Sequence, residues 1–366
     1  MERELRILHV VRQFHPGVGG LESYVRNMAD QQRKLGHECA ILTLNKIFHG
    51  EKGALASHEV VDGLPVYRVP FLGRRRFFLP VVSLSFLRRH DVIHVHNTDG
   101  FFDTISLMSG KVGKPIFATT HGGFFHTKTL SAFKKIYFRF ITSRLGKNYR
   151  AIFAISQNDY DTFKSVNDNL MLKPNAIVPA GDFIAAGDDF VYLGRLAKHK
   201  NVEAVIRTFA LLKTRHAKAG KLHIIGPEWD VRQSDLSSLA KSSGAGDDVV
   251  FHGFIAPGRM KEVLRGCGWF VSASSFEGFG MSMLEAMSVG LIPFVQPNES
   301  FLELIEAGKV GSAIDFSSPG QAATLISEQM NDISMEDRQK ARDFALQFSW
   351  EKLADDTVKA YREHGE

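Results

Sequence analysis

The sequence contains little cysteine and no long hydrophobic run, and these absences exclude several protein classes. Only two of its 366 residues are cysteine, Cys39 and Cys267, and no CxxC or Cys/His metal-binding spacing surrounds them. We therefore expect neither a disulfide framework nor a structural zinc site, and the composition suits the reducing cytoplasm. The longest apolar stretch, residues 77–87, contains Pro80 and is too short to span a bilayer.

The amino-terminal segment also lacks the features of a secretory signal. Its first residues, MERELRILHVVRQFHPG, mix acids with bases and enter a strand-like run at once. No basic segment precedes a separate apolar core and a small-residue cleavage site, so we expect no signal peptide. At 366 residues the chain exceeds the length at which one hydrophobic core stops growing, which favours two domains.

The charge is distributed unevenly along the chain. Residues 1–175 carry 25 Lys and Arg against 14 Asp and Glu, whereas the remainder carries 20 against 26. The net charge of +5 therefore combines a basic first half with an acidic second half. Such a basic half is typical of a protein that faces phosphate, nucleic acid or an anionic membrane.

Short apolar runs alternate with helical patterns throughout, which is typical of an α/β fold with parallel sheets. In the first half the predicted strands are 6–11, 38–44, 64–70, 91–96, 115–120 and 151–156; in the second half they are 190–195, 221–226, 249–254, 269–274 and 291–296. Residues 175–189 are rich in Gly, Ala and Asp and predict a linker between two domains. In open parallel sheets ligands bind beyond the carboxyl ends of the strands.

The final segment predicts a helix with one apolar face. From Trp350 to Tyr361 the side chains of one face recur at helical spacing, namely Trp350, Leu353, Ala354, Thr357, Val358 and Tyr361. A docked helix at the end of the chain follows from this pattern.

Residues 274–290, SSFEGFGMSMLEAMSVG, are the strongest candidate for a ligand site. A buried strand is expected to end near Ser274, and a glycine-bearing loop leads to a helix that begins near Met281. Free backbone N–H groups at a helix start favour phosphate, with Glu277 before that point and Glu285 one turn into the helix. In the alternative interpretation, Glu277 is an ordinary loop acid and Glu285 a solvated helix residue.

A second cluster, GRLAKHK at 194–200, places bases in a loop after a strand. Arg195 and Lys200 suit a diphosphate, because Arg offers a bidentate contact and Lys a point charge. Lys198 is expected to face solvent. The alternative is that all three bases simply form a solvated turn.

These segments together resemble the family 4 retaining glycosyltransferases, which have the GT-B fold. The resemblance rests on five segments: GRLAKHK (194–200), LHIIG (222–226), VVFHGF (249–254), EGFGMSMLE (277–285) and the terminal FSWEKLADDTVKAY. It implies two Rossmann-like parallel-sheet domains facing across a cleft, with the last helix crossing back to the first domain. The expected domains are 1–178 with helix 350–366, which binds the acceptor and faces the membrane, and 179–349, which binds the nucleotide-sugar donor.

The resemblance also implies roles for individual residues of the second domain. Arg195 and Lys200 would neutralise the donor diphosphate, Glu277 would position sugar hydroxyls, and Glu285 would hold the ribose. Phosphate and sugar would be contacted by backbone groups of Phe279, Gly280, Met281 and Ser282. The base would lie beside Phe254 and Ile255.

The first half matches the family less specifically. Gly19 and Gly20 follow the first strand, where family members place glycines against donor and acceptor, and Ser156 matches a serine at the interdomain cleft. The loop Thr119-Thr-His-Gly-Gly-Phe-Phe-His-Thr127 matches the one that carries a reaction-centre histidine, here His121. The residues expected around the acceptor are Gly20, His96, Asn97, His121, Gly122, Gly123, Phe124 and His126.

The implied chemistry needs no metal and no cofactor beyond the sugar donor. Arg195 and Lys200 would stabilise the departing nucleoside diphosphate, and a front-side mechanism would retain the anomeric configuration. His121 would line the sugar pocket and stabilise the oxocarbenium-like state, although a histidine after a strand is otherwise often a turn residue. Asp159 and Asp161 have the spacing of a DxD metal motif but fall in a helix-like stretch.

Two basic segments of the first half predict a protein surface that contacts the membrane. Residues 128–150 predict a basic amphipathic helix, and residues 73–89 combine bases with aromatics. We expect these segments to rest the first domain on the anionic inner face of the cell membrane and to hold a lipid-linked acceptor. The alternative is a core-facing helix with a solvated basic face.

Among family members, the sequence looks most like the α-mannosyltransferases of bacterial exopolysaccharide assembly. These enzymes use GDP-mannose and a cellobiosyl-diphosphate-polyprenol acceptor, so the expected partners are a nucleotide sugar and a polyprenol-diphosphate-linked oligosaccharide, without nucleic acid. A UDP-sugar donor with another acceptor, a GT-B-fold epimerase or phosphorylase, and a non-catalytic sugar-binding protein at the membrane stay open. An NAD-dependent dehydrogenase is disfavoured, because Glu22 occupies the third glycine position of its fingerprint.

Overall fold

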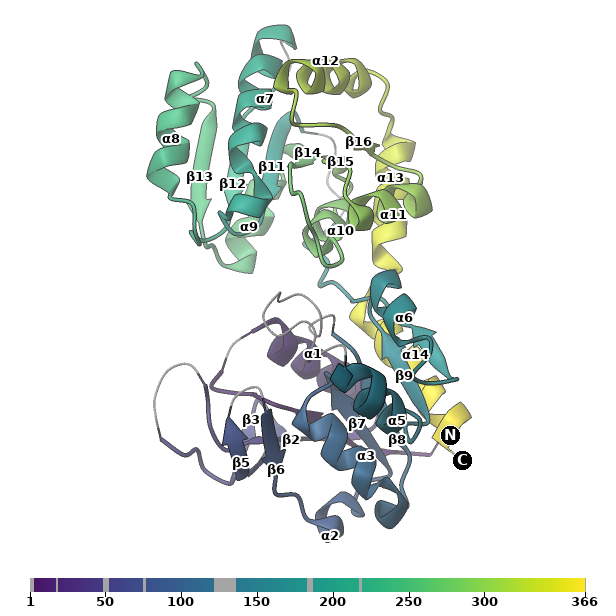
Figure 1. Ribbon diagram of the computed structural model, residues 1–366. Coiled ribbons are helices and arrows are strands. Elements are labelled where there is room, and N and C mark those ends of the chain that lie inside the picture. The colour runs from purple at the N-terminus through teal and green to yellow at the C-terminus, as the bar shows by residue number, and fades with distance from the viewer. Residues whose placement is uncertain are drawn as a thin grey trace. The chain divides into compact units, whose positions relative to one another are not determined.

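The chain folds into two α/β units, each built on its own β-sheet (Figure 1). The computed structural model describes residues 3–17, 19–48, 53–74, 77–121, 136–182, 187–216 and 219–365. The first unit comprises Met1–Asn175 and Trp350–Glu366, and the second comprises Ala176–Ser349. Ile177 belongs to the second unit because its backbone N–H donates to the carbonyl of Phe348 and it pairs with Ser349.

The first unit contains an eight-stranded sheet in the order β10-β9-β8-β7-β1-β2-β4-β3. Its strands are β1 (Arg6–Val11), β2 (Glu38–Leu44), β3 (His58–Val61), β4 (Leu64–Val69), β7 (Val92–His96), β8 (Ile116–Thr119), β9 (Ala151–Ala154) and β10 (Leu170–Leu172). All neighbours are parallel except β3 and β4, which are antiparallel. A separate hairpin is formed by β5 (Phe71–Arg74) and β6 (Phe77–Pro80).

The second unit contains a six-stranded parallel sheet in the order β13-β12-β11-β14-β15-β16. Its strands are β11 (Asp189–Leu193), β12 (Leu222–Ile225), β13 (Val249–Gly253), β14 (Cys267–Ser272), β15 (Ile292–Val295) and β16 (Ser312–Ala313). Every strand predicted from the sequence is confirmed to within two residues at each end.

Helices cover both faces of the first sheet. Its helical elements are α1 (Gly20–Lys34), α2 (Leu84–Leu87), α3 (Gly100–Val112), the π-helix η1 (Phe138–Thr142), α5 (Ser143–Gly146), α6 (Gln157–Phe163) and α14 (Trp350–Gly365). Val25 of α1 and Val358 of α14 pack with Ile7 and Val11 of β1 on one face. Side chains of α3 pack with Leu8 and Val10 on the other face. Successive side chains of β1 therefore alternate between two hydrophobic cores.

Helix α14 presents the face that its sequence spacing predicts. The buried residues are the expected Trp350, Leu353, Ala354, Thr357, Val358 and Tyr361, together with Ala360. It packs beside α1 within the first unit. The end of the chain is thus part of the unit formed by its beginning.

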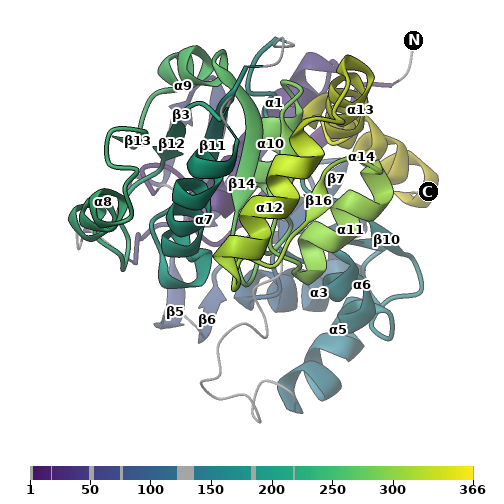
Figure 2. The same ribbon diagram turned by 90° about the horizontal axis from the view of Figure 1, so that it is seen from above.

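The helices of the second unit surround a single continuous core. They are the 3-10 turn η2 (Lys198–Lys200), α7 (Val202–Arg215), α8 (Gln233–Ser242), α9 (Pro257–Leu264), α10 (Met281–Met287), α11 (Glu299–Gly308), α12 (Pro319–Met330) and α13 (Met335–Leu346). Figure 2 shows α7 and α12 side by side, in agreement with their mutual packing.

The expected amphipathic helix at 128–150 needs correction where the structure describes it. Residues 128–135 lie outside the described part of the chain. Beyond them the helix contains the π-helical segment η1 and ends at Gly146. Asn167 stops it, because its Nδ2 donates to the carbonyls of Gly146 (2.9 Å) and Tyr149 (2.8 Å). Among the described residues, no helix combines the length and apolarity needed to cross a membrane.

Candidate functional site

The polar loops of the second unit follow the carboxyl ends of two adjacent strands, β11 and β14. The loop after β11 carries Arg195 and Lys200, and the loop after β14 carries Glu277. Gly226, which follows β12, has a positive φ of 148°, and a Cβ there would overlap the carbonyl oxygen of Gly194. Glycine thus allows the ends of β11 and β12 to approach closely.

Hydrogen bonds fasten the two loops to each other. The carbonyl of His199 accepts from both the backbone N–H (2.8 Å) and the hydroxyl (3.1 Å) of Ser275. Asn298 Nδ2 donates to the carbonyl of Ser274 (2.8 Å), and the hydroxyl of Ser300 donates to the carbonyl of Glu277 (2.9 Å). These bonds fix the position from which Glu277 projects.

Lys200 and Glu277 form an ion pair between these loops. The Nζ of Lys200 lies 2.7 Å from each carboxylate oxygen of Glu277. The two side chains are only 14% and 11% exposed, so solvent screens their interaction weakly. Two residues that the sequence assigned to one ligand are therefore in direct contact, 77 positions apart in the chain.

Arg195 belongs to the same loop as Lys200 and is exposed. Its guanidinium stacks on the Trp229 ring, 4.6 Å from the ring centre, and its carbonyl accepts from the Tyr192 hydroxyl (2.9 Å). Burial raises the pKa of Tyr192, the nearby charge of Glu277 raises it further, and the charge of Arg195 lowers it. Both charges thus act on the same phenol. Lys198 is exposed, as expected.

Glu285 lies on α10. The N-cap residue of this helix is Gly280, which has no side chain to cap it. The preceding Gly280 has a φ of 93°, and a Cβ at this residue would lie 2.8 Å from Leu304 Cδ1. Burial raises the pKa of the Glu285 carboxyl to about 7. The side chain of Glu285 is half-buried, so it is not fully solvated. None of the hydrogen bonds or ion pairs of the described residues involves its carboxylate.

The remaining candidates of the second unit differ in exposure. Phe254 follows β13 and is 85% exposed, whereas Ile255 packs against the core. Phe279 is partly buried and meets the Phe348 ring edge-on, with 5.7 Å between ring centres. Met281 is 39% exposed and begins α10. Ser282 is half-buried.

In the first unit His121 follows β8 and is held by other aromatic side chains. Its φ of 55° is unusual for a residue other than glycine. Its Nε2 lies 3.1 Å from His96 Nδ1, and the Tyr24 ring meets it edge-on at 4.4 Å. Burial lowers the pKa of His121 to about 3, so its imidazole is neutral at physiological pH. The structure thus brings His96 and His121 together.

Other first-unit candidates occupy loop and cap positions. Gly19 and Gly20 form the start of α1, and a Cβ on Gly20 would meet open space. Ser156 caps α6 by accepting from the Asp159 N–H (3.2 Å). Asn97 has a φ of 82° and its Oδ1 accepts from the Thr98 N–H. The remaining acceptor candidates lie outside the described residues: Gly122, Gly123, Phe124 and His126.

The two acids of the DxD spacing do not share a site. Asp159 is buried and accepts from the Thr120 hydroxyl (2.5 Å). Asp161 is exposed and pairs with Lys164. A metal ion held by both carboxylates would require this arrangement to be broken.

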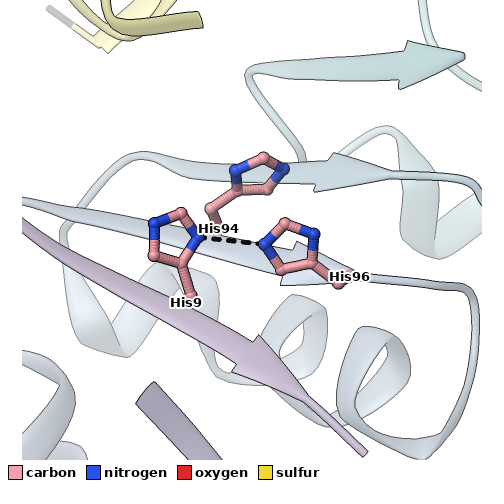
Figure 3. Close-up of side chains that lie close together, drawn as sticks. All are labelled: His9, His94 and His96. Carbon is pink, nitrogen blue, oxygen red and sulfur yellow. Dashed lines mark hydrogen bonds between the residues drawn. The ribbon is translucent and has the colours of Figure 1, made fainter. Parts of the chain in front are cut away.

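Two polar residues buried near His121, His9 and Gln32, were not predicted from the sequence. His9 of β1 lies beside His94 and His96 of β7, with rings close together (Figure 3). Gln32 of α1 and Tyr361 of α14 hydrogen-bond to this group. The available signal was the presence of histidines within otherwise apolar strands, RILHVV and VIHVH.

Two family descriptions match the chain, one for each half. The description "Glycosyltransferase Family 4" matches residues 18–179, and "Glycosyl transferases group 1" matches residues 185–347. Together they cover most of the chain, and the second contains every donor-site candidate of the second unit.

Three bacterial relatives carry the same printed name, GDP-mannose:cellobiosyl-diphosphopolyprenol alpha-mannosyltransferase. The Xanthomonas oryzae protein is 32% identical over 85% of this chain and 83% of its own length. The Komagataeibacter xylinus protein is 30% identical over 99% of this chain and 94% of its own length. The Xanthomonas campestris protein is 33% identical over 82% of this chain and 80% of its own length.

Solved glycosyltransferase structures share the fold at low sequence identity. Anabaena HepE in complex with UDP matches with a TM-score of 0.72 and 15% identity, over 98% of this chain and all of that one. A glycosyltransferase from Rickettsia africae matches with a TM-score of 0.71 and 15% identity, over 99% of both chains.

The raised pKa of Glu285 predicts a pH-dependent stability. Because the folded pKa of about 7 exceeds the ordinary 4.5, the folded state binds the proton more tightly than the unfolded state. The Glu285 contribution to stability should therefore fall between about pH 4.5 and 7 and stay constant outside this range. We expect Glu285→Gln to be stabilised relative to the wild type by about 1–3 kcal/mol more at pH 8 than at pH 4.5.

Urea unfolding at both pH values measures this difference. Glu306→Gln, at an exposed acid of α11, is the control and should track the wild type at both pH values. If Glu285→Gln also tracks the wild type, its carboxyl titrates normally and the predicted shift is wrong.

The ion pair predicts that binding and turnover respond differently to its two partners. Lys200→Met should raise the Kd for a nucleoside diphosphate about 10- to 100-fold, because a charge-assisted contact is lost. Glu277→Gln should leave this Kd unchanged or lower it, because Lys200 is no longer neutralised, while sugar transfer falls at least about 100-fold.

Titration calorimetry and a transfer assay separate the two effects. Lys198→Met is the matched control from the same loop and should change the Kd less than about twofold. Equal weakening of binding by Lys198→Met and Lys200→Met would contradict a specific diphosphate contact.

Proposed function

The chain belongs to the family 4 glycosyltransferases, and on this basis we propose that it transfers mannose from GDP-mannose to a polyprenol-diphosphate-linked oligosaccharide. The reaction retains the anomeric configuration, as in the family. Three relatives at 30–33% identity support the mannosyl donor and the lipid-linked acceptor. The proposal places the protein in bacterial exopolysaccharide synthesis.

The observation that carries the proposal is the Lys200–Glu277 pair. It joins the loops that follow β11 and β14, where parallel sheets bind ligands, and Arg195 lies in the first of these loops. The cations suit a diphosphate, and the carboxylate can accept hydrogen bonds from sugar hydroxyls. Glu285, one helix turn on, would accept from the ribose hydroxyls, and Phe254 and Ile255 would border the base.

In the proposed reaction the bond between the anomeric carbon and the phosphate oxygen breaks. Arg195 and Lys200 stabilise the negative charge that develops on the departing diphosphate. The acceptor hydroxyl forms the new bond on the same face of the sugar, and its proton passes to the departing phosphate. No protein nucleophile takes part.

The first unit would hold the acceptor and contact the transferred sugar. His121 is neutral and can hydrogen-bond to a hydroxyl without adding a charge that repels the oxocarbenium-like state. His96, Asn97 and Gly20 would border the acceptor, and Gly19 and Ser156 would face the donor. The acceptor would also be bordered by Gly122, Gly123, Phe124 and His126.

A membrane surface on the first unit would give access to the lipid carrier. The segment that begins at residue 136 exposes Ile136 (58%), Phe140 (66%) and Ile141 (41%), beside Arg139 and Arg144. Phe138 and Leu145 of the same segment pack against the core, so these exposed residues lie apart from its core-facing side. The β6 strand exposes Phe77 and Leu79, and both β6 and α5 pack on α3. Exposed apolar side chains among bases are typical of a membrane interface.

Nucleotide preference tests the proposed donor. In a thermal-shift panel of GDP, UDP and ADP at equal concentration, we expect GDP to raise the Tm most. A ligand at 100 times its Kd adds about 2.7 kcal/mol to the free energy of unfolding. A larger shift with UDP would contradict the mannosyl donor and favour a UDP-sugar. Release of GDP from GDP-mannose without acceptor would instead favour an epimerase or a related activity.

Co-sedimentation with liposomes tests the proposed membrane surface. We expect binding to vesicles that contain anionic lipid, weakened by salt, and a several-fold loss of binding in Phe140→Ser. Leu325→Ser on α12 of the second unit is the control, because Leu325 is also exposed (44%). Equal binding to neutral vesicles, or equal loss in both variants, would contradict this surface.

A further inference from the structure

A continuous chain of hydrogen bonds connects His121 to Gln32 in the first unit. Gln32 Oε1 lies 2.8 Å from His9 Nε2. His9 Nδ1 lies 2.9 Å from His96 Nε2, the bond drawn as a dashed line in Figure 3. His96 Nδ1 then lies 3.1 Å from His121 Nε2. The chain joins α1, β1, β7 and the loop after β8, and it uses both ring nitrogens of His9 and of His96.

The imidazoles of this chain are neutral. Gln32, His9 and His96 are fully buried, and burial lowers the pKa of His9 to about 4 and that of His96 well below its ordinary value. A neutral imidazole has one N–H donor and one acceptor nitrogen. Each ring that accepts a hydrogen bond at one nitrogen must therefore donate from the other, so the direction of the whole chain is set at its end.

The amide oxygen of Gln32 sets that direction, because it can only accept. His9 must then donate from Nε2 and accept at Nδ1. His96 consequently donates from Nε2 and accepts at Nδ1, which requires His121 to donate from Nε2. The remaining nitrogen of His121, Nδ1, is then unprotonated and able to accept.

Two further buried groups hold the Gln32 amide in this orientation, Cys39 and Tyr361. Cys39 Sγ lies 3.7 Å from Gln32 Oε1, and burial raises the pKa of the thiol to about 12, so it keeps its proton for donation. On the other side Gln32 Nε2 lies 3.5 Å from the Tyr361 hydroxyl. That hydroxyl can donate to His94 Nδ1 (2.5 Å), whose Nε2 donates to Thr119 Oγ1 (2.7 Å). The branch therefore links Gln32 to Thr119 through Tyr361 and His94.

A metal ion accounts for the three adjacent histidines less well. Ring nitrogens of His9, His94 and His96 lie within 4.8 Å of one another. All six of these nitrogens, however, already have hydrogen-bond partners among the described residues. An ion would have to displace several of these bonds in a fully buried site.

We propose that Gln32, through His9 and His96, fixes His121 as its Nε2–H tautomer and so presents Nδ1 as an acceptor for a hydroxyl group of the substrate. Gln32, His9 and His96 are positioning residues for His121. The use of Nδ1 in catalysis rests on the proposed function, whereas the tautomer is a property of the free protein.

Nitrogen NMR of the protein labelled with ¹⁵N-histidine tests the tautomer directly. The His121 signals, assigned by their loss in His121→Gln, should show a protonated Nε2 and an unprotonated Nδ1. A protonated Nδ1, or a mixture of both tautomers, would overturn the proposal. Stoichiometric zinc retained after dialysis, with metal-shifted histidine signals, would also overturn it.

A pair of variants then separates positioning from loss of stability. Gln32→Leu removes the terminal acceptor and should give mixed His121 tautomers and a kcat about tenfold lower, with less than a twofold change in the KM for the donor. Phe153→Leu removes buried apolar volume from the same face of the sheet and is the control. It should lower the Tm but preserve the tautomer.

Different results would contradict the role of Gln32 and the role of His121 Nδ1. If Gln32→Leu gives mixed His121 tautomers but an unchanged kcat, His121 Nδ1 has no role in transfer. The conclusion that Gln32 sets the tautomer of His121 would still hold. A wild-type Nε2–H tautomer that persists in Gln32→Leu would show that Gln32 does not set it.

Discussion

The structure of the first unit depends on one constraint, which is that polar groups removed from water must find hydrogen-bond partners. Three histidines lie on the face of the sheet that α1 and α14 cover, where most other side chains are apolar. They satisfy one another and bind Gln32, Thr119 and Tyr361. The last helix therefore contributes hydrogen bonds as well as apolar contacts to the unit formed by the start of the chain.

The second unit applies the same constraint to charges. Lys200 and Glu277 are nearly buried at the ends of neighbouring strands and neutralise each other. A buried pair of this kind adds little net stability, because both charges lose their hydration. Its value lies in keeping a cation and a carboxylate in fixed positions, in loops where a diphosphate and a sugar would bind.

Elements with strong local patterns could be predicted from the sequence. The structure confirms the buried strands β1 and β2 and the apolar face of α14. Continuous apolar runs and helical spacing are local patterns, so they can be recognised without knowing the tertiary structure. The short strands β3, β5, β6, β10 and β16 were missed. They have two to four residues each, too few for a pattern, and they depend on pairing with a neighbour.

The α/β class, the family and the residue types at each strand end could be predicted from the sequence, because they follow from local composition and motif spacing. Which of these residues meet depends on the tertiary structure. His9 and His96 are 87 positions apart and Lys200 and Glu277 are 77 apart, and parallel pairing of the strands brings each pair into contact. Burial, which makes the histidines neutral and raises the pKa of Glu285, is likewise a property of the packed fold.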